Sequence, residues 1–322
     1  MAIEKIWVVA EPAGEGKVSS LSLELLTKAR QLASVVEAVT WGDAEALAAE
    51  VGAYGATTLH TVGDLGASLP GPAVAAAIAA AVNGGSGPDA VFLGQDNDGR
   101  DIAARLSARL DRPVLTNIVG LSDEGGLLTE HGVFGGAEIV KARFSGDGPG
   151  IYVVRTKSFA AEPSDGATAA VAALAVGDLG ATDGAKVLDR HVEERQGPKL
   201  DEAPVVVSGG RGLGQADKYE LIEQVAKLLH GAAGASRAIV DAGWVPYSHQ
   251  VGQTGKTVKP TVYIAAGISG ATQHMVGMKG SKNIIAINKD QEAPIFSIAD
   301  LGVVGDVHKV LPKLIEALQK RS

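Results

Sequence analysis

Short apolar runs alternate with helix-like segments along residues 6–111, and this alternation constrains the fold more than any other feature. The apolar runs are IWVVAE, VEAVTWG, TTLHTV and DAVFLGQ, and the segments that follow them are SLSLELLTKARQLAS, GDAEALAAEVGA, PAVAAAIAAAVNG and DIAARLSARLD. Strands that are apolar on both faces and separated by helices are typical of a parallel sheet covered on both sides. The chain is therefore expected to begin with an α/β domain.

The region after Asp111 is richer in strand-like runs, which read VLTNIVGLS, LLTEHGVFGG, AEIVKARF and GIYVVRTKSF. Residues 181–203 are then charged and poor in apolar side chains, which indicates an extended crossing to a second domain. At 322 residues the chain is long enough for two domains with a core each. We place the boundary near Asp201, giving an N-terminal domain of residues 1–200 and a C-terminal domain of residues 201–322.

The C-terminal domain repeats a strand, a glycine-containing loop and a helix. Strands are predicted at PVVVSG, AIVDAG, TVYIAAG and NIIAI, with a helix through Lys218 to Leu229 and a closing helix from Asp306 to about Lys320. This repeat is typical of a doubly wound, Rossmann-like domain, which binds nucleotides at the carboxyl ends of its strands.

Composition excludes several classes of function. The formal net charge is -8, so charge gives no reason to expect binding to nucleic acid or an anionic membrane. Without cysteine the chain has no disulfide and no thiolate, so redox chemistry would need a bound cofactor. The longest apolar stretch, Ala73 to Val82, is about half of what spans a bilayer. The N-terminal MAIEKIWVVAE lacks the basic flank of a targeting peptide, so we expect a cytoplasmic protein.

The run VGQTGKT, Val251 to Thr257, looks like a phosphate loop but departs from the Walker pattern in two ways. Gln250 stands where the first glycine is required. Pro260 and the β-branched and aromatic residues after it predict a strand, whereas a phosphate loop leads into a helix. The run is therefore interpreted as a small hydroxyl-bearing loop that leads into a strand.

Several polar loops are expected at the carboxyl ends of the C-terminal strands. SGGRGLG places backbone amides and Arg211 where a diphosphate could bind, although its glycine spacing also fits a plain tight turn. In ISGATQH, Ser269 is a natural N-cap of a short helix that contains His274. Asn288 ends a third strand, and Asp306 fits a helix cap equally well. Together these loops indicate a site for a long ligand that contains phosphate.

Other polar features carry weaker signals. The Ser236-Arg237 pair also fits a cap and a solvated charge, and a lone histidine is more often structural than functional. The segment Gln95 to Gly99 resembles a calcium loop, but counted from Asp96 its glycine is at the fourth position instead of the sixth, so we interpret it as a turn and cap before a helix starting near Asp101. The seven histidines form no pair at i, i+4, so no metal site is expected.

The run from Ser208 to Lys320 resembles the carboxyl-terminal flavin domain of electron transfer flavoprotein α subunits. The matching pieces are SGGRGLG, GASRAIVDAGWVP and QVGQTGKTVKPTVYIAAGISGATQHMVGMKGSKNIIAINKDQEAPIFSIADLGVVGD. Leu301 stands where the family is expected to have an aromatic residue, and Gly280 where an acidic residue is commoner. For the first domain, the resemblance implies an α/β fold like that of adenine-nucleotide hydrolases.

The resemblance implies one FAD per heterodimer, held mainly by the C-terminal domain. It places Val251, Gly252, Gln253 and Thr254 beside the isoalloxazine ring, with the Thr254 hydroxyl near flavin N5. Arg237 would lie over the ring and His274 near its N1 and O2 edge, where both would tune the reduction potential. The rest of the cofactor and its surroundings would be held by Arg211, Ser236, Ser269, Gly270, Ala271, Thr272, Gln273, Asn288, Asp306 and Val307.

The resemblance also implies an electron carrier that does not itself transform a substrate. A β subunit would complete the flavin pocket and hold an AMP. Electrons would come from acyl-CoA dehydrogenases and similar flavin enzymes, and would pass to a membrane electron transfer flavoprotein-quinone oxidoreductase. Two alternatives stay open at this point: the α subunit of a complex that oxidises NADH by electron bifurcation, and a non-redox module that binds an adenine nucleotide.

Overall fold

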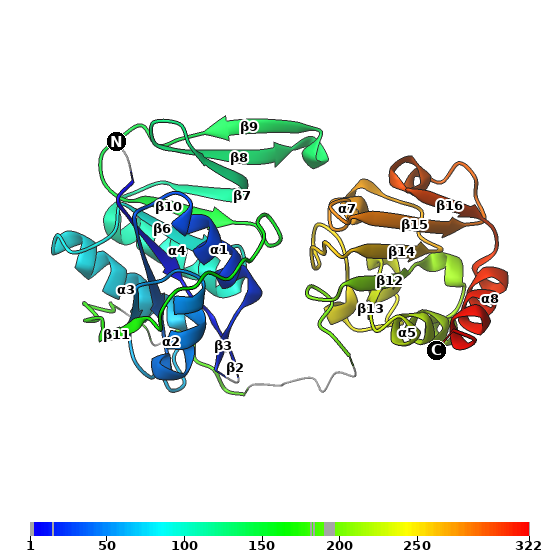
Figure 1. Cartoon of the computed structure of the whole chain (residues 1–322), viewed down its shortest axis with the longest axis horizontal. Coiled ribbons are helices and arrows are strands. Elements are labelled where there is room, and N and C mark those ends of the chain that lie inside the picture. Colours follow the sequence, from blue (N-terminus) through cyan, green and yellow to red (C-terminus); the bar gives the residue numbers. More distant parts are fainter. Residues whose placement is uncertain (1–2, 15, 181, 183, 190–196, 322) are drawn as a thin grey trace. The chain divides into compact units, whose positions relative to one another are not determined.

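Two compact units, Met1–His191 and Val192–Ser322, make up the chain (Figure 1). The computed structural model describes residues 3–14, 16–180, 182, 184–189 and 197–321. The predicted crossing at 181–203 therefore lies partly outside the described residues. The predicted boundary near Asp201 falls after the division between the two units, in a turn at Leu200–Glu202.

The N-terminal unit is built on a nine-stranded sheet of order β11-β5-β4-β1-β6-β10-β7-β8-β9. Neighbouring strands run parallel from β11 to β7, and β7, β8 and β9 are antiparallel. The strands of the unit, including the small hairpin β2–β3, are β1 Lys5–Val9, β2 Pro12–Gly14, β3 Lys17–Val18, β4 Val35–Thr40, β5 Thr58–Thr61, β6 Ala90–Gly94, β7 Val114–Asp123, β8 Leu127–Val133, β9 Glu138–Ala142, β10 Gly150–Val154 and β11 Ala170–Ala173.

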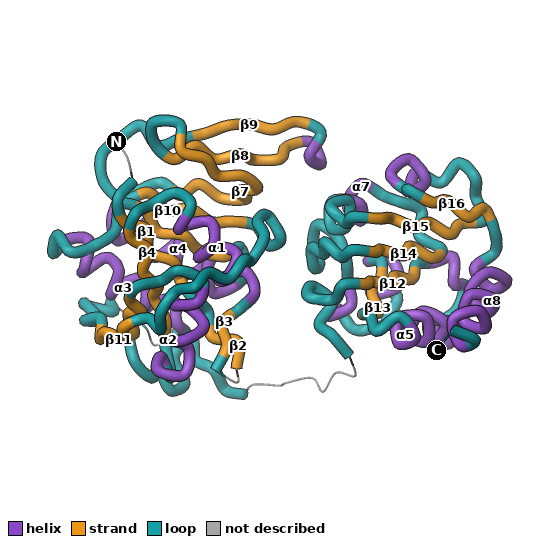
Figure 2. The backbone as a smooth tube through the Cα atoms, viewed as in Figure 1, coloured by secondary structure: helices purple, strands orange, loops and turns teal. Residues whose placement is uncertain are grey.

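Helices cover both faces of this sheet, as the purple and orange segments of Figure 2 show. The helices are α1 Ser20–Arg30, α2 Ala44–Ala53, α3 Pro70–Asn83 and α4 Asn97–Leu110. Leu25 of α1 and Val51 of α2 pack with Ile6 and Val8 on one face, whereas Ile78 of α3 packs on the other face. The predicted α/β fold with a parallel sheet is confirmed for this unit.

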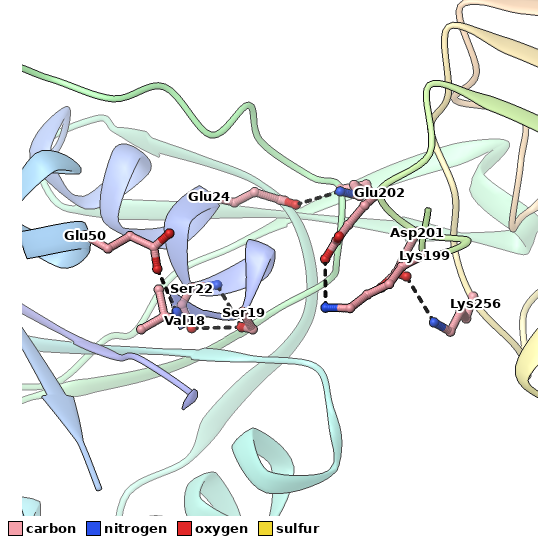
Figure 3. Close-up of polar contacts among 10 residues, drawn as sticks. Val18, Ser19, Ser22, Glu24, Glu50, Lys199, Asp201, Glu202 and Lys256 are labelled. Carbon is pink, nitrogen blue, oxygen red and sulfur yellow. Dashed lines mark hydrogen bonds and ion pairs between the residues drawn. The ribbon is translucent and has the colours of Figure 1, made fainter. Parts of the chain in front are cut away.

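Local polar contacts fix the connections at the start of the N-terminal unit (Figure 3). Ser19 caps α1, because its side-chain oxygen accepts from the Ser22 amide at 3.2 Å. The Glu50 carboxylate accepts from the Val18 amide at 2.7 Å and so ties the β2–β3 hairpin to α2. Asp96 caps α4 by accepting from the Gly99 amide at 2.6 Å. This helix therefore begins at Asn97, and the predicted start near Asp101 is wrong.

The C-terminal unit is a five-stranded parallel sheet of order β13-β12-β14-β15-β16. Its strands are β12 Val205–Gly209, β13 Ala232–Ala235, β14 Val262–Ala266, β15 Asn283–Asn288 and β16 Leu301–Val304. Its helices are α5 Glu220–Leu228, α6 Arg237–Val240, α7 Thr272–Met275 and α8 Val307–Gln319. The predicted Rossmann-like fold is confirmed.

The two faces of the C-terminal sheet are covered differently. Ile222 of α5 and Leu311 of α8 pack on one face with Val207 and Ile264. The other face buries Tyr263 beneath loops and the one-turn helix α7. A face covered by loops leaves backbone and polar groups close to the sheet edge, where a site can be built.

The strand predicted at AIVDAG is wrong, because Arg237–Val240 forms helix α6. The strand lies earlier, at the small residues Ala232–Ala235, which pair with Val206–Gly209 of β12. Gly234 is required there, since a Cβ at this position would approach the Ser208 Oγ to 2.4 Å. Ser236 and Arg237 therefore follow a strand and lie at its carboxyl end.

Candidate functional site

The candidate site lies at the carboxyl edge of the C-terminal sheet. The chain passes from β12 to β13 on one side and then returns to β14 on the other, so the strand order reverses between β12 and β14. Ligands of open α/β sheets bind at such a switch point, outside the carboxyl ends of the strands. All the loops predicted to form the site leave the sheet at this edge.

The glycine turn after β12 packs against the loop after β14. A Cβ on Gly212 would lie 2.6 Å from the Gly267 Cα, and Gly267 has a positive φ of 65°. The amides of Gly210 and Gly212 donate to the carbonyls of Ala266 and Gly267 at 3.0 and 2.9 Å. These amides are occupied and a 3-10 turn follows, so the expectation that this turn presents its amides to a diphosphate is wrong for Gly210 and Gly212. The turn offers instead the exposed side chain of Arg211.

Backbone hydrogen bonds join the predicted loops to one another. The Ser236 amide donates to the Gly209 carbonyl at 2.9 Å, and the Val251 amide donates to the Ala235 carbonyl at 2.9 Å. The Gln253 amide donates to the Gln273 carbonyl at 2.7 Å. The structure thus brings SGGRG, the Ser236-Arg237 pair, VGQT and ISGATQH into one connected edge.

The same edge continues to the end of the sheet. Asn288 donates from its side-chain amide to the Ile268 carbonyl at 2.9 Å, and its own carbonyl accepts from the Gly305 amide at 2.9 Å. The Asp306 side chain accepts from the His308 amide at 2.9 Å, so Asp306 is the N-cap of α8. Val307 is buried at 3% exposure and anchors this helix in the core.

Arg237 is an exposed cation at this edge. Its side chain is 66% exposed, and its Nε lies 3.0 Å from an Asp241 carboxylate oxygen one helical turn away. Exposed pairs of this kind stabilise a helix by about 0.5 kcal/mol or less. The guanidinium can therefore leave Asp241 for an anionic or aromatic ligand at small cost.

The VGQT loop is held in place by Gln250 and Tyr247, for which the sequence predicted no such role. Gln250, which is 2% exposed, donates from its amide to the Thr254 Oγ1 at 3.0 Å. Tyr247 donates its phenol proton to the Thr254 carbonyl. The Thr254 hydroxyl accepts the bond from Gln250 and keeps its proton for a further hydrogen bond. The exposed Gln253 and Thr254 are the accessible part of the loop, and Val251 and Gly252 are buried.

Lys256 of the GKT run forms an ion pair within the protein and does not act as a phosphate-binding lysine. Its ammonium lies 3.0 Å from an Asp201 carboxylate oxygen, as Figure 3 shows. The residues after Thr257 form no helix before strand β14. The run is therefore no Walker loop.

The loop after β14 has free backbone amides. Within the described residues, the amides of Ser269, Gly270, Ala271 and Thr272 donate to no backbone carbonyl. Ala271 is the N-cap residue of α7, so the prediction that Ser269 caps this helix is wrong. Ser269, Ala271, Thr272 and Gln273 are exposed, whereas Gly270 is buried against Ile295.

His274 lies in α7, as predicted, and is buried at 6% exposure. Its Nε2 lies 3.0 Å from the Tyr263 Oη. Its Nδ1 is buried and has no hydrogen-bond partner among the described residues, and we call this atom the open Nδ1. Burial lowers the pKa of His274 to about 4, and the Val251 backbone offsets part of the shift although it does not reach hydrogen-bonding geometry at the open Nδ1. In the ligand-free chain the imidazole is therefore neutral at pH 7.

The residues fit a bound flavin nucleotide. The edge combines two exposed guanidiniums, a row of free amides and buried glycines that allow close approach of a ligand. The open Nδ1 is a buried polar atom that lacks an acceptor or donor, which is costly unless a ligand supplies one. Such a set can bind phosphate, orient a planar ring and donate hydrogen bonds to it.

A second cluster of titratable groups lies at the carboxyl edge of the N-terminal sheet. Glu11 follows β1, and Asp96 and Asp98 follow β6, the neighbouring strand. Burial, together with the charges of Asp96 and Asp98, raises the pKa of Glu11 to about 8. In the part of the chain that the structure describes, no group of three or more acidic or histidine side chains is placed to hold a metal ion.

A Rossmann-like sheet whose polar loops gather at its switch point defines a protein that binds a nucleotide cofactor. Residues 199–279 match the electron transfer flavoprotein FAD-binding domain, and residues 6–179 match the electron transfer flavoprotein domain. The chain belongs to the electron transfer flavoprotein α-subunit family. Its members are electron carriers, which agrees with the expectation that the chain is no turnover enzyme.

Curated relatives match over nearly the whole chain. The electron transfer flavoprotein subunit alpha of Mycobacterium leprae is 42% identical over 95% of this chain and 96% of its own length. The subunit alpha of Mycobacterium tuberculosis is 43% identical over 98% of this chain and 99% of its own. Protein FixB of Clostridium saccharobutylicum is 35% identical over 96% of this chain and 95% of its own length. In the described residues, no helix is long and apolar enough to cross a membrane.

Proposed function

We propose that this chain binds one FAD at the carboxyl edge of its C-terminal sheet and relays electrons as the α subunit of an αβ heterodimer. The observation that carries the proposal is the connected edge itself, because the open Nδ1, the free amides and the two exposed arginines all lie within residues 199–279, which match the FAD-binding domain. The cofactor would be held by Arg211, Ser236, Arg237, Val251, Gly252, Gln253, Thr254, Ser269, Gly270, Ala271, Thr272, Gln273, His274, Asn288, Asp306 and Val307.

Each part of the edge has a separate role in this proposal. Bound FAD supplies the electron transfer itself. Arg211 and the amides after β14 neutralise phosphate, because guanidinium and free N–H groups are the donors that phosphate prefers. Thr254 donates its hydroxyl proton to the ring, and the hydrogen bond from Gln250 holds the hydroxyl in place. Arg237 places positive charge over the ring and thereby favours its reduction.

The partners belong to the same proposal. A β subunit completes the pocket and carries an AMP, and the heterodimer works in the cytoplasm. It accepts electrons from acyl-CoA dehydrogenases in fatty-acid β-oxidation and from other flavin dehydrogenases, then passes them to a membrane electron transfer flavoprotein-quinone oxidoreductase. The formal net charge of -8 suits brief docking to several soluble partners, because long-range charge acts on encounter more than on affinity.

The test is the visible absorption spectrum and reduction potential of the chain co-purified with its β neighbour. We expect flavin absorbance in the wild type. In Arg237→Ala the loss of a partly exposed cation should disfavour the reduced ring by about 1 to 2 kcal/mol. This makes the one-electron potential about 40 to 90 mV more negative, because each tenfold change in the equilibrium constant of a one-electron step corresponds to about 59 mV.

Two variants control this measurement. Arg237→Lys keeps the charge and should lose only part of the shift, whereas Arg321→Ala, at the end of the chain, should leave the potential unchanged. No flavin absorbance after addition of FAD would sink the proposal and favour a non-redox module that binds an adenine nucleotide. A wild-type complex that oxidises NADH while bifurcating electrons would replace the simple carrier with the bifurcating complex.

A further inference from the structure

Tyr263 lies directly behind His274 in the core of the C-terminal unit. It is 0% exposed on β14, and its Oη is 3.0 Å from the His274 Nε2. The ring centroids are 6.1 Å apart and tilted by 57°, so the contact is made through the hydroxyl and not by stacking. The phenol therefore acts on the imidazole as a hydrogen-bonding group.

The direction of this hydrogen bond follows from counting donors and acceptors. Burial raises the pKa of Tyr263, so the phenol keeps its proton and needs an acceptor. Ser208 is on the same face of the sheet, and its hydroxyl offsets part of this pKa rise, as a group that donates to the phenol oxygen does, so it does not take the phenol proton. The acceptor is therefore the His274 Nε2. In a neutral imidazole the proton is then on Nδ1.

The opposite tautomer would leave more groups unsatisfied. If Nε2 donated to Tyr263, the buried phenol proton and the Nδ1 lone pair would both need partners that the described residues do not supply. With the phenol donating, the only group left over is the Nδ1 proton. Buried polar groups are satisfied in native proteins, so the tautomer with one group left over is the favoured one.

We infer that Tyr263 is a positioning residue that holds His274 in the Nδ1–H tautomer, so that the histidine presents a neutral hydrogen-bond donor to an acceptor on the bound cofactor. The inference rests on the proposed FAD site. It adds a residue outside the ligand contacts and specifies the protonated atom. The backbone of His274 borders the VGQT loop, because a Cβ on Gly252 would lie 3.5 Å from the His274 Cα.

The first test reads the tautomer without any cofactor. Ligand-free full-length chain, in complex with its β neighbour, is labelled with ¹⁵N histidine, and the His274 signals are assigned by their loss in His274→Gln. We expect a protonated Nδ1 and an unprotonated Nε2 in the wild type. In Tyr263→Phe the proton should move to Nε2 or divide between the two atoms. A wild-type proton on Nε2, or no change in Tyr263→Phe, would overturn the inference.

Tyr219→Phe is the matched control. Tyr219 is a second buried tyrosine of the same unit, and its phenol donates to the Gly234 carbonyl at 3.0 Å instead of to a histidine. Removing its hydroxyl also deletes one buried hydrogen bond, so it should lower stability about as much as Tyr263→Phe. The His274 signals should nevertheless keep the wild-type pattern in Tyr219→Phe.

The second test measures the FAD dissociation constant by flavin fluorescence. We expect Tyr263→Phe to weaken FAD binding about tenfold, because the donor to the cofactor is no longer fixed, and Tyr219→Phe to change it less than about twofold. Equal weakening in the two variants indicates loosening of the domain and overturns the positioning role. A wild type that binds no FAD while keeping the Nδ1–H pattern refutes the proposed function and leaves the tautomer assignment standing.

Discussion

Gly270→Ala is expected to destabilise the C-terminal unit by about 3 kcal/mol and to weaken FAD binding at least tenfold. Gly270 has a positive φ of 88°, and an added Cβ would lie 2.3 Å from the Ile295 amide nitrogen. That amide donates to the Ser269 carbonyl at 3.0 Å, so the neighbour is fixed backbone that cannot move aside cheaply. Overpacking costs about 1 to 3 kcal/mol, and a non-glycine residue with positive φ adds about 1 to 2 kcal/mol.

The measurement is native-state hydrogen exchange of the β14 and β15 amides, which reports this unit alone. Gly280→Ala is the control, since the Cβ there would be 3.5 Å from the flexible side chain of Lys259. It should leave the exchange rates and FAD affinity close to wild type. Equal protection in Gly270→Ala and the wild type would show that the loop after β14 is adaptable and does not fix the site.

The second large effect concerns the pH dependence of the N-terminal unit through Glu11. Burial, with the charges of Asp96 and Asp98, raises the pKa of this carboxyl from 4.5 to about 8. Between these values the folded chain keeps a proton that the unfolded chain releases, so the free energy of unfolding falls as pH rises. Glu11→Gln keeps the shape without a titratable proton, and should remove this slope.

The expected gain in Glu11→Gln is about 2 kcal/mol at pH 8.5, after discounting the shift for solvent screening. At pH 5 the wild-type carboxyl is largely protonated in the folded state, so the two proteins should be nearly equally stable. Hydrogen exchange of the β1 and β6 amides measures both conditions within this unit. A variant that is less stable than the wild type at pH 8.5 would contradict the raised pKa and point to a carboxylate needed for the fold.

The architecture was largely predictable because its signal is local. IWVV and AVFLG are apolar at every position, and each became a central strand buried on both faces. Errors in the type of element arose where the signal was weak. The small residues of β13 do not look like a strand, since their pairing with β12 depends on a glycine that lets the Ser208 side chain fit. The β-branched AIV was predicted as a strand but is a helical turn after Ser236.

The candidate site was predictable as a set of loops but not in its chemistry. The strand-glycine-helix repeat places SGGRG, ISGATQH and Asn288 at one sheet edge, because parallel strands end on the same side. The occupied amides of Gly210 and Gly212 depend on contact with Gly267, which is distant in sequence. The contacts of Gln250 with Thr254 and of Tyr263 with His274 gave no signal, since a glutamine before a loop and a tyrosine in an apolar strand are ordinary residues until their partners are known.

The sequence by itself determined the parallel α/β layers, the two units and the family, because periodicity and contiguous motifs are properties of neighbouring residues. Only the tertiary structure decided which polar atoms are satisfied. Burial makes His274 neutral, and the Tyr263 hydroxyl forms a hydrogen bond with its imidazole. Asp201 forms an ion pair with Lys256 of the VGQTGKT run. Hydrogen bonding and desolvation depend on what surrounds a group in three dimensions, and those surroundings come from segments far apart in the chain.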